Sequence, residues 1–297
     1  MSTKQNNAAI WGNLVRFPNL FTVPGDALIG FFLVSGVVFS PAMALAGLSV
    51  LFIYIGGLLF NDYFDREIDA RQRPVRPLPS GDVKPETVFA AAIIAMLFGS
   101  IPAFFMGYFS VLTVLILIIF VIIYNAGAKK NPLTGLPLLG GCRFLSVMTG
   151  AAFADGSLGL MAFVAAAAAF LYTVSLSIAA LDETRKDADI KTLWLPVLVW
   201  PVVFGAVLIF CDSAPWPLAF IFAAGCFELL RARLLVAAGI IETPAFIGLC
   251  IRVMIWSQLF WLFVADWPGY FTGLLFLIIF ILFRFCAGYY SKKFYGS

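Results

Sequence analysis

Long apolar runs separated by short polar interruptions dominate the chain from residue 20 onwards. The runs at 111–124, 217–227 and 272–283 contain no charged residue. Interruptions recur about every 20 to 25 residues, which is the length of a helix that crosses a bilayer. The pattern predicts about ten membrane helices, at residues 20–40, 42–63, 85–106, 109–127, 136–154, 159–182, 192–211, 216–238, 245–265 and 269–289.

The composition supports a membrane protein. Hydrophobic residues make up 62% of the chain and charged residues only 12%, whereas soluble domains carry about 25% charged residues. The predicted fold class is therefore all-α, a polytopic membrane bundle of about nine to ten transmembrane helices. One domain is expected to cover residues 1–297, with the main polar loops at 64–84 and 183–191.

The distribution of Lys and Arg predicts the orientation of the bundle. The turns that follow the odd-numbered predicted helices contain no Lys or Arg, and the opposite ends of the helices hold nearly all of them. Because positive charge accumulates in cytoplasmic loops, both termini and the charged loops are expected on the cytoplasmic side. In a bacterium this would be the cytoplasmic side of the cell inner membrane.

The richest chemistry lies in residues 61–69, at the end of the second predicted helix, where nine residues include four acids. If the helix continues through them, Asn61, Asp65 and Asp69 fall at i, i+4 and i+8, and Asp62 shares their face with Asp69. Carboxylates on one face repel one another unless a cation lies between them. Oxygen ligands of this kind favour a hard divalent cation such as Mg²⁺.

A second acid-rich stretch follows the sixth predicted helix and lies on the same side of the membrane. It contains Asp182, Glu183, Asp187 and Asp189, with Arg185 and Lys186 between them. Either stretch alone could be a solvated loop of mixed charge. Two such stretches on one face instead favour a diphosphate, whose oxygens bind both Mg²⁺ and basic side chains. An apolar cavity beside them indicates an isoprenyl diphosphate.

The chain contains no histidine. Catalysis by Ser-His or Cys-His pairs and metal sites built on histidine are therefore excluded, which leaves carboxylates, Lys, Tyr and a hard metal. The five cysteines lie in or beside apolar segments without CxxC spacing and are interpreted as small buried residues.

The segment from Asn61 to Asp69, followed by the sequence RPLPSG at 76–81, closely resembles the first signature of the UbiA superfamily of intramembrane prenyltransferases, N-x3-D-x3-D and then R-P-L-x-S-G. Residues 16–19 resemble the segment before the first helix of that family, 124–130 its Y-x3-K element, and 182–189 its second aspartate motif. Residues 140–147 and the tenth helix resemble the EboC-like branch. The resemblance implies a helical bundle around a central cavity with a cytoplasmic cap.

The sequence departs from the family pattern in two places. Four residues instead of three separate Tyr124 from Lys129, so either Lys129 is displaced or the helix end is rearranged locally. In the second motif only Glu183 and Asp187 keep the D-x3-D spacing, with Glu183 in place of the first aspartate. A metal site can form there if the longer Glu183 side chain replaces the first aspartate as a ligand. Catalysis depends on this replacement.

The resemblance implies a role for each motif residue. The implied Mg²⁺ ligands are Asn61, Asp62, Asp65, Asp69, Asp182, Glu183 and Asp187. The implied catalytic residues are Asp65, Asp69, Asp182, Asp187, Tyr124 and Lys129. The implied substrate-binding residues are Asn61, Arg16, Arg73, Arg76, Arg143 and Lys130.

Several of these residues have a second interpretation. Arg73 could anchor the membrane surface, and Tyr124 is also typical of an interfacial tyrosine. Arg143, inside an apolar helix, could line the cavity or pair with a structural acid. Asp26 is interpreted as a charge at a helix N-terminus, and Glu228 and Arg231 are expected to pair at a helix end.

The leading hypothesis is Mg²⁺-dependent transfer of an isoprenyl group from an isoprenyl diphosphate to a small acceptor within the membrane. The acceptor could be aromatic, a cyclitol or another alcohol. The alternatives are a terpene cyclase of the same fold and a non-catalytic protein that binds or transports prenyl lipids. The expected partners are the diphosphate donor, the acceptor and the lipid bilayer, and no nucleic acid is expected.

Overall fold

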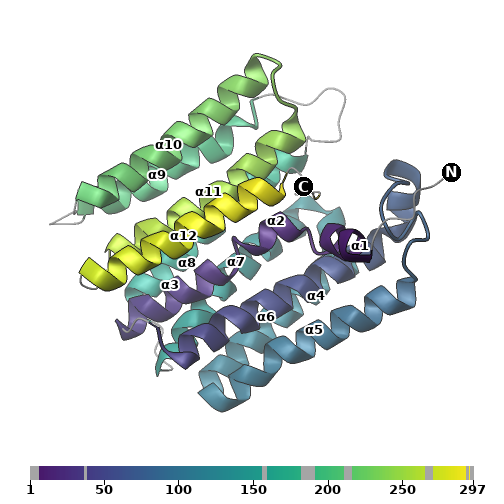
Figure 1. The fold of residues 1–297 in the computed structure, drawn as a ribbon, viewed down its shortest axis with the longest axis horizontal. Coiled ribbons are helices and arrows are strands. Elements are labelled where there is room, and N and C mark those ends of the chain that lie inside the picture. The colour runs from purple at the N-terminus through teal and green to yellow at the C-terminus, as the bar shows by residue number, and fades with distance from the viewer. Residues whose placement is uncertain are drawn as a thin grey trace.

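The computed structural model describes residues 7–36, 39–155, 159–181, 191–210, 216–264, 270–291 and 294, which form an all-helical bundle (Figure 1). The short helices α1 and α2 precede ten longer ones. In chain order the helices are α1 (Asn7–Leu14), α2 (Phe17–Leu20), α3 (Pro24–Ser35), α4 (Pro41–Gln72), α5 (Pro85–Met106), α6 (Tyr108–Ala126), the 3-10 turn η1 (Ala128–Lys130), α7 (Pro132–Asp155), α8 (Leu160–Leu181), α9 (Trp194–Phe210), α10 (Trp216–Ala237), α11 (Thr243–Val264) and α12 (Tyr270–Tyr290).

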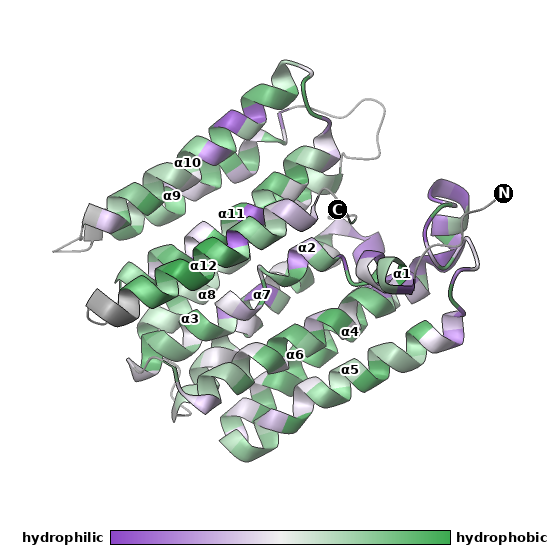
Figure 2. Ribbon diagram, viewed as in Figure 1, coloured by the Kyte–Doolittle hydropathy of each residue, from purple (hydrophilic) through white to green (hydrophobic). Residues whose placement is uncertain are grey.

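The predicted fold class is confirmed. Each of the ten predicted helices has a counterpart among α3 to α12. Seven segments of the described chain are long and apolar enough to cross a membrane, and α9 and α12 contain shorter apolar helices. The outer helices expose large apolar side chains, such as Phe104 at 67% and Phe105 at 77%, and hydrophobic residues cover most of the bundle (Figure 2). The chain is a multi-pass membrane protein.

Helix α4 extends further than the sequence prediction. A helix at 42–63 and a loop from residue 64 were expected, but α4 continues to Gln72 and residues 64–72 are helical. The helix ends where Arg73 precedes Pro74, because a residue before proline is disfavoured in the α conformation. The motif from Asn61 to Asp69 therefore lies on one continuous helix, which fixes the spacing of its side chains.

The first predicted helix is shorter than expected. Instead of one helix at 20–40, the chain turns at 21–23 between α2 and α3. Pro24 begins α3, where its missing N–H is not needed, and Gly36 ends it in the left-handed conformation with φ of 63°. This turn places α1 and α2 across the end of the bundle that carries the last turns of α4 (Figure 1).

Helices α3 and α7 cross at close range through glycine. A Cβ atom on Gly30 would lie 1.9 Å from the Val147 carbonyl oxygen, and one on Gly150 would lie 1.9 Å from the Ala27 carbonyl oxygen. Only residues without a side chain allow the two backbones to approach this closely. The crossing brings Asp26 on α3 next to the middle of α7.

Candidate active site

Lys129 connects two residues of the acidic face of α4. Its Nζ donates a hydrogen bond to Asn61 Oδ1 at 2.9 Å and lies 2.7 Å from Asp65 Oδ2. Asn61 and Asp65 are one helical turn apart, so a single ammonium group reaches both oxygens. Burial lowers the pKa of Lys129 from its ordinary value of 10.5, and the Asp65 carboxylate opposes this shift.

The irregular helix end explains how Lys129 reaches this position. Helix α6 stops at Ala126, Gly127 adopts φ of 150°, and residues 128–130 form the 3-10 turn η1. This backbone conformation strongly favours glycine. Of the two sequence-based alternatives, local rearrangement of the helix end is therefore the one observed, and it absorbs the additional residue between Tyr124 and Lys129.

Arg76 folds back onto the last turns of α4. Its Nη1 donates a hydrogen bond to Asp69 Oδ2 at 2.8 Å and lies 3.7 Å from Asp62 Oδ1. The turn after Arg76 is held by the Ser80 N–H, which donates to the Arg76 carbonyl, and by buried Leu78. Gly81, with φ of 80°, completes it. The turn formed by the RPLPSG sequence thus positions Arg76 next to the carboxylates of Asp62 and Asp69.

Arg16 reaches the same cluster from the opposite side. It occupies the junction of α1 and α2 in the left-handed conformation, with φ of 44° and ψ of 58°. A non-glycine residue rarely adopts this conformation unless its surroundings hold it there. Its Nη2 lies 3.9 Å from Asp62 Oδ1, a carboxylate on the face of α4 next to Asn61.

A cavity of about 310 Å³ lies beside this cluster. At the polar end it is lined by Arg16, Asn61 and Tyr124, and deeper by mainly apolar residues of α4, α6, α7, α8 and α11. The deeper residues include Val50, Ile53, Leu117, Val121, Leu139, Leu176, Ile247, Ile251 and Met254. A chain of carbon atoms could lie in the apolar part while a charged group remains at the polar end.

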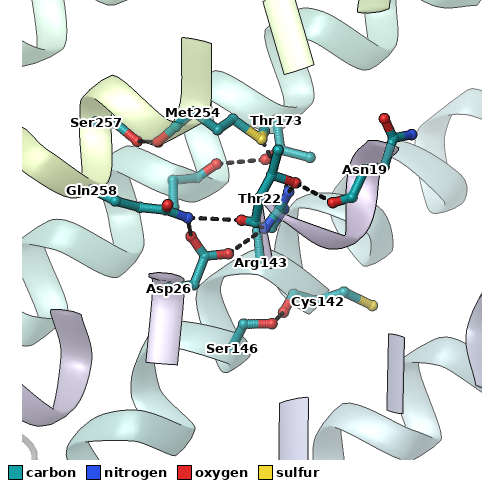
Figure 3. A network of polar contacts seen from close by, with 11 residues as sticks. Asn19, Thr22, Asp26, Cys142, Arg143, Ser146, Thr173, Met254, Ser257 and Gln258 are labelled. Carbon is teal, nitrogen blue, oxygen red and sulfur yellow. Dashed lines mark hydrogen bonds and ion pairs between the residues drawn. The ribbon is translucent and has the colours of Figure 1, made fainter. Parts of the chain in front are cut away.

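Arg143 lines the cavity, and both of its Nη atoms also contact other residues of the bundle (Figure 3). Its Nη1 forms an ion pair with Asp26 Oδ2 and donates to the Thr22 carbonyl at 2.9 Å. Its Nη2 donates to Thr22 Oγ1 at 2.9 Å and contacts Met254 Sδ at 3.1 Å. Both sequence-based alternatives for Arg143 therefore describe it. Asp26 lies in the first turn of α3, as expected for a charge at a helix N-terminus, and it also pairs with Arg143.

Gln258 completes the network around Asp26. Its Nε2 donates to Asp26 Oδ1 and to the Thr22 carbonyl, both at 2.7 Å (Figure 3). The carboxylate is buried with both oxygens satisfied, one by Arg143 and the other by Gln258. This arrangement ties α3, α7 and α11 together beside the cavity, because a buried ion pair is stable only when its remaining polar atoms are also satisfied.

The oxygens on α4 fit Mg²⁺ if a substrate supplies further ligands. Asn61, Asp65 and Asp69 present one amide and two carboxylate groups on one helix face, and Mg²⁺ is usually bound by one or two carboxylates together with substrate phosphates. The buried Asp62 Oδ1 accepts no hydrogen bond from the described residues. A cage of three or more His, Cys, Asp or Glu side chains does not occur in the described ranges.

The remaining predicted site residues differ in their positions. Tyr124 is half-buried and lines the cavity. Arg73 caps α4 and Lys130 is exposed, and neither makes an ion pair with the part of the chain that the structure describes. Asp182, Glu183 and Asp187 of the second motif lie outside the described residues, so their roles stay predictions.

Sequence reasoning missed Asn125, which follows Tyr124 on α6. Its amide nitrogen donates to the Gly57 carbonyl at 3.2 Å and to the Val121 carbonyl at 3.0 Å. Its Oδ1 is buried without a hydrogen bond from the described residues, and the residue lines the cavity. An asparagine within a run of apolar residues is the sequence signal that could have identified it.

The profile of the UbiA prenyltransferase family matches residues 26–198, which is more than half of the chain. The chain belongs to the UbiA prenyltransferase family. The match contains α4, η1, α7 and the second acidic stretch, so it covers Asn61 and Tyr124 at the polar end of the cavity, and Arg16 precedes it. Family membership confirms the resemblance that residues 61–69 and 76–81 indicated.

Relatives of known name include digeranylgeranylglyceryl phosphate synthases. A digeranylgeranylglyceryl phosphate synthase of Methanothrix thermoacetophila is 35% identical over 169 residues, 56% of this chain and 60% of that protein. One of Sulfurisphaera tokodaii is 27% identical over 185 residues, 61% of this chain and 66% of that protein. The matches thus span about two thirds of these relatives or less.

Solved structures share the fold. The apo structure of a UbiA homologue from Aeropyrum pernix K1 has a TM-score of 0.65 at 19% identity and covers 80% of this chain and 94% of that one. A UbiA homologue from Archaeoglobus fulgidus bound to GPP and Mg²⁺ has a TM-score of 0.59 at 13% identity and covers 94% of this chain and 98% of that one. At these identities the likeness establishes the helical arrangement of the family.

Proposed function

We propose that this protein transfers an isoprenyl group from an isoprenyl diphosphate to a small acceptor within the membrane, in a reaction that depends on Mg²⁺. The observation that carries the proposal is the meeting of α4 oxygens with Lys129, Arg76 and Arg16 at the polar end of an apolar cavity. The relatives' name and the GPP and Mg²⁺ bound to a structural neighbour support it.

The basic residues would hold the diphosphate while the acids hold the metal. Asn61, Asp65 and Asp69 would bind Mg²⁺, with Asp62 as a further ligand or support. When bound, Mg²⁺ neutralises charge that develops on the departing diphosphate. In the described structure Lys129 pairs with Asp65 and Arg76 pairs with Asp69. Because both acids are proposed metal ligands, the two basic side chains are close enough to move onto phosphate oxygens when a substrate arrives.

The bond changes follow from these positions. The C1–O bond of the donor breaks with its electron pair on the diphosphate, which Lys129, Arg76 and Arg16 stabilise as the leaving group. The apolar cavity excludes water from the allylic cation, and the acceptor forms the new bond to C1. The acceptor's proton passes to the diphosphate or to a carboxylate, since the chain contains no histidine to receive it.

Among the acceptor classes expected from the sequence, we favour an alcohol, specifically the hydroxyl of a glyceryl phosphate lipid. The name digeranylgeranylglyceryl phosphate synthase of the relatives supports this choice. The polar side chains deeper in the cavity, Ser146, Thr173 and Ser177, could contact such a hydroxyl. The proposed orientation places this end of the bundle and both termini on the cytoplasmic side.

The proposal is tested with purified protein, Mg²⁺ and radiolabelled geranyl, farnesyl and geranylgeranyl diphosphates, with geranylgeranylglyceryl phosphate as acceptor. We expect labelled product, its loss with a chelator, and a decrease of at least about 100-fold in Asp65→Asn and Asp69→Asn. Glu86→Gln, at an exposed acid in the first turn of α5, is the matched control and should retain activity.

Other results would identify a different activity. A cyclic hydrocarbon formed from the diphosphate alone would show a terpene cyclase. Tight binding of the diphosphate without turnover, with this acceptor and with membrane extract, would contradict the transferase proposal and favour a binding protein.

A further inference from the structure

Helices α10, α11 and α12 carry charged side chains that the cavity does not use. They lie beyond the family match, which ends at residue 198. Glu228 is on α10, Arg252 on α11 and Arg284 on α12, and hydrophilic bands interrupt these otherwise apolar helices in Figure 2. Ile251 and Met254 line the cavity whereas Arg252 does not, so Arg252 lies on another face of α11.

The pairing of these charges differs from the sequence prediction. Arg284 Nη2 donates to Glu228 Oε2 at 2.5 Å, across two different helices. The expected pair of Glu228 with Arg231 is wrong, because Arg231 is exposed on the outside of α10. Arg252 makes no hydrogen bond or ion pair within the described residues, although the charges of Arg284 and Glu228 both act on it. Two guanidinium groups and one carboxylate therefore act on one another, and only Arg284 contacts the carboxylate.

Two glycines provide space beside the guanidinium groups. Arg252 Nη1 lies 3.6 Å from the position of a Cβ on Gly248, one turn earlier on α11, and Arg284 Nη1 lies 3.8 Å from that on Gly288, one turn later on α12. Helix α11 runs opposite to α12, so both side chains point to the same end of the bundle. Tyr290 at that end packs against Phe17 with ring centroids 4.9 Å apart, next to Arg16.

Arg252 and Arg284 both have hydrogen-bond donors without a partner among the described residues. The Nε atoms of Arg252 and Arg284 are buried and have no hydrogen-bond partner among the described residues. Guanidinium groups provide only donors, so an incoming group must be an acceptor, and the surplus of positive charge requires it to be an anion. Planar guanidinium groups match the oxygens of phosphate particularly well.

We propose that Arg252 and Arg284 form a phosphate-binding site at the edge of the bundle, separate from the cavity. Phe227, next to Glu228 in the sequence of α10, and Phe285, next to Arg284 in that of α12, are exposed apolar side chains, as is Leu282 on α12. They would contact the acyl chains of a membrane lipid whose phosphate occupies the site. A lipid headgroup is thus the expected source of the phosphate, and free phosphate is the alternative source.

The test measures binding rather than prenyl transfer, so it is independent of the proposed function. The full chain in neutral detergent is titrated with phosphatidylglycerol, with phosphatidylcholine, and with inorganic phosphate at matched ionic strength, and the shift in Tm is recorded. We expect phosphatidylglycerol to raise Tm more than phosphatidylcholine. The half-effect concentration is the phosphatidylglycerol concentration that gives half of the maximal Tm shift. In Arg252→Gln it should rise at least tenfold.

Two further variants identify the origin of the effect. Arg231→Gln removes the same charge from the exposed face of α10 and should change the half-effect concentration by less than twofold. Glu228→Gln releases Arg284 from its partner and should lower that concentration.

The response to inorganic phosphate and the response of the control variant Arg231→Gln decide between the outcomes. A shift that depends on Arg252 but occurs equally with inorganic phosphate would support the phosphate site and assign it to a soluble anion. Equal responses of Arg252→Gln and Arg231→Gln, or no difference between the two lipids together with no response to phosphate, would overturn the proposal.

Discussion

Arg143 and Arg252, two of the arginines in the apolar helices of this bundle, differ in their partners. Arg143 on α7 is satisfied by Asp26 on α3, by Met254 on α11 and by Thr22 in the turn before α3. Arg252 on α11 has no hydrogen bond or ion pair in the described ranges. A charge at the membrane centre costs about 2.5–3.5 kcal/mol on insertion scales. The first arginine is compensated by the fold, and the second requires compensation from outside the chain.

The polar end of the cavity is an intermediate case. Lys129 pairs with Asp65 and Arg76 pairs with Asp69, so positive and negative charges balance there without a ligand. A diphosphate with Mg²⁺ brings both signs of charge and can exchange partners with these pairs. Matched charges suit the proposed ligand, a metal–diphosphate pair that carries both signs of charge, whereas the surplus on α11 and α12 suits a lone anion.

The largest difference is expected between Arg143→Gln and Arg252→Gln. Loss of the Arg143 charge leaves Asp26 buried without its cation and should lower the free energy of unfolding by about 3–5 kcal/mol. Arg252→Gln removes no partner and should change it by less than about 0.5 kcal/mol in neutral detergent. Denaturant unfolding of both variants in the same detergent measures the difference.

A double variant sharpens this result. Arg143→Gln with Asp26→Asn removes both charges and should recover part of the loss, because the two residues interact directly. Similar destabilisation by Arg143→Gln and Arg252→Gln would show that the difference in partners has no energetic consequence.

The next largest effect is expected at the crossing of α3 and α7, which brings Asp26 to Arg143. Gly150→Ala would place a Cβ 1.9 Å from the Ala27 carbonyl oxygen, a backbone atom that cannot move aside easily. The free energy of unfolding should fall by about 3 kcal/mol. Thermal unfolding should show a lower Tm. Separation of α3 from α7 should also weaken the contacts between Asp26 and Arg143.

The control for this variant is Gly205→Ala on α9. A Cβ there meets its nearest neighbour, Phe222 Cζ, at an ordinary 3.6 Å. Stability should be unchanged or slightly higher, since alanine has the better helix propensity. Equal losses at both positions would indicate that the close crossing is unimportant.

A smaller effect is expected at Gly127, which positions Lys129. Gly127→Ala introduces a side chain at φ of 150° and should cost about 1–2 kcal/mol in strain. Displacement of Lys129 from Asp65 should reduce kcat/KM for the diphosphate about tenfold. Ala126→Gly, one residue earlier, weakens the helix by about 1 kcal/mol and should leave kcat/KM unchanged. Full activity of Gly127→Ala would show that Lys129 reaches Asp65 without this turn.

The helical elements and the first half of the site could be predicted from local sequence. Apolar runs located the ten helices, and the spacing of Asn61, Asp65 and Asp69 predicted one shared helix face, because the period of an α-helix fixes which side chains are neighbours. Boundaries were less accurate. The apolar run predicted a helix end at residue 63, whereas α4 continues through the polar residues 64–72. The shared face of Asn61, Asp65 and Asp69 required such a continuation, but the apolar pattern did not mark it.

Contacts between distant residues were decided by the tertiary structure. The Arg143–Asp26 pair joins residues 117 apart in sequence, and the Arg284–Glu228 pair joins residues 56 apart. Periodicity gives the rotation of a side chain about its own helix but not the helix that will face it. The sequence by itself therefore determined a membrane helix bundle with the signature of the UbiA family, whereas helix packing decided which arginines are satisfied and which remain available to a ligand.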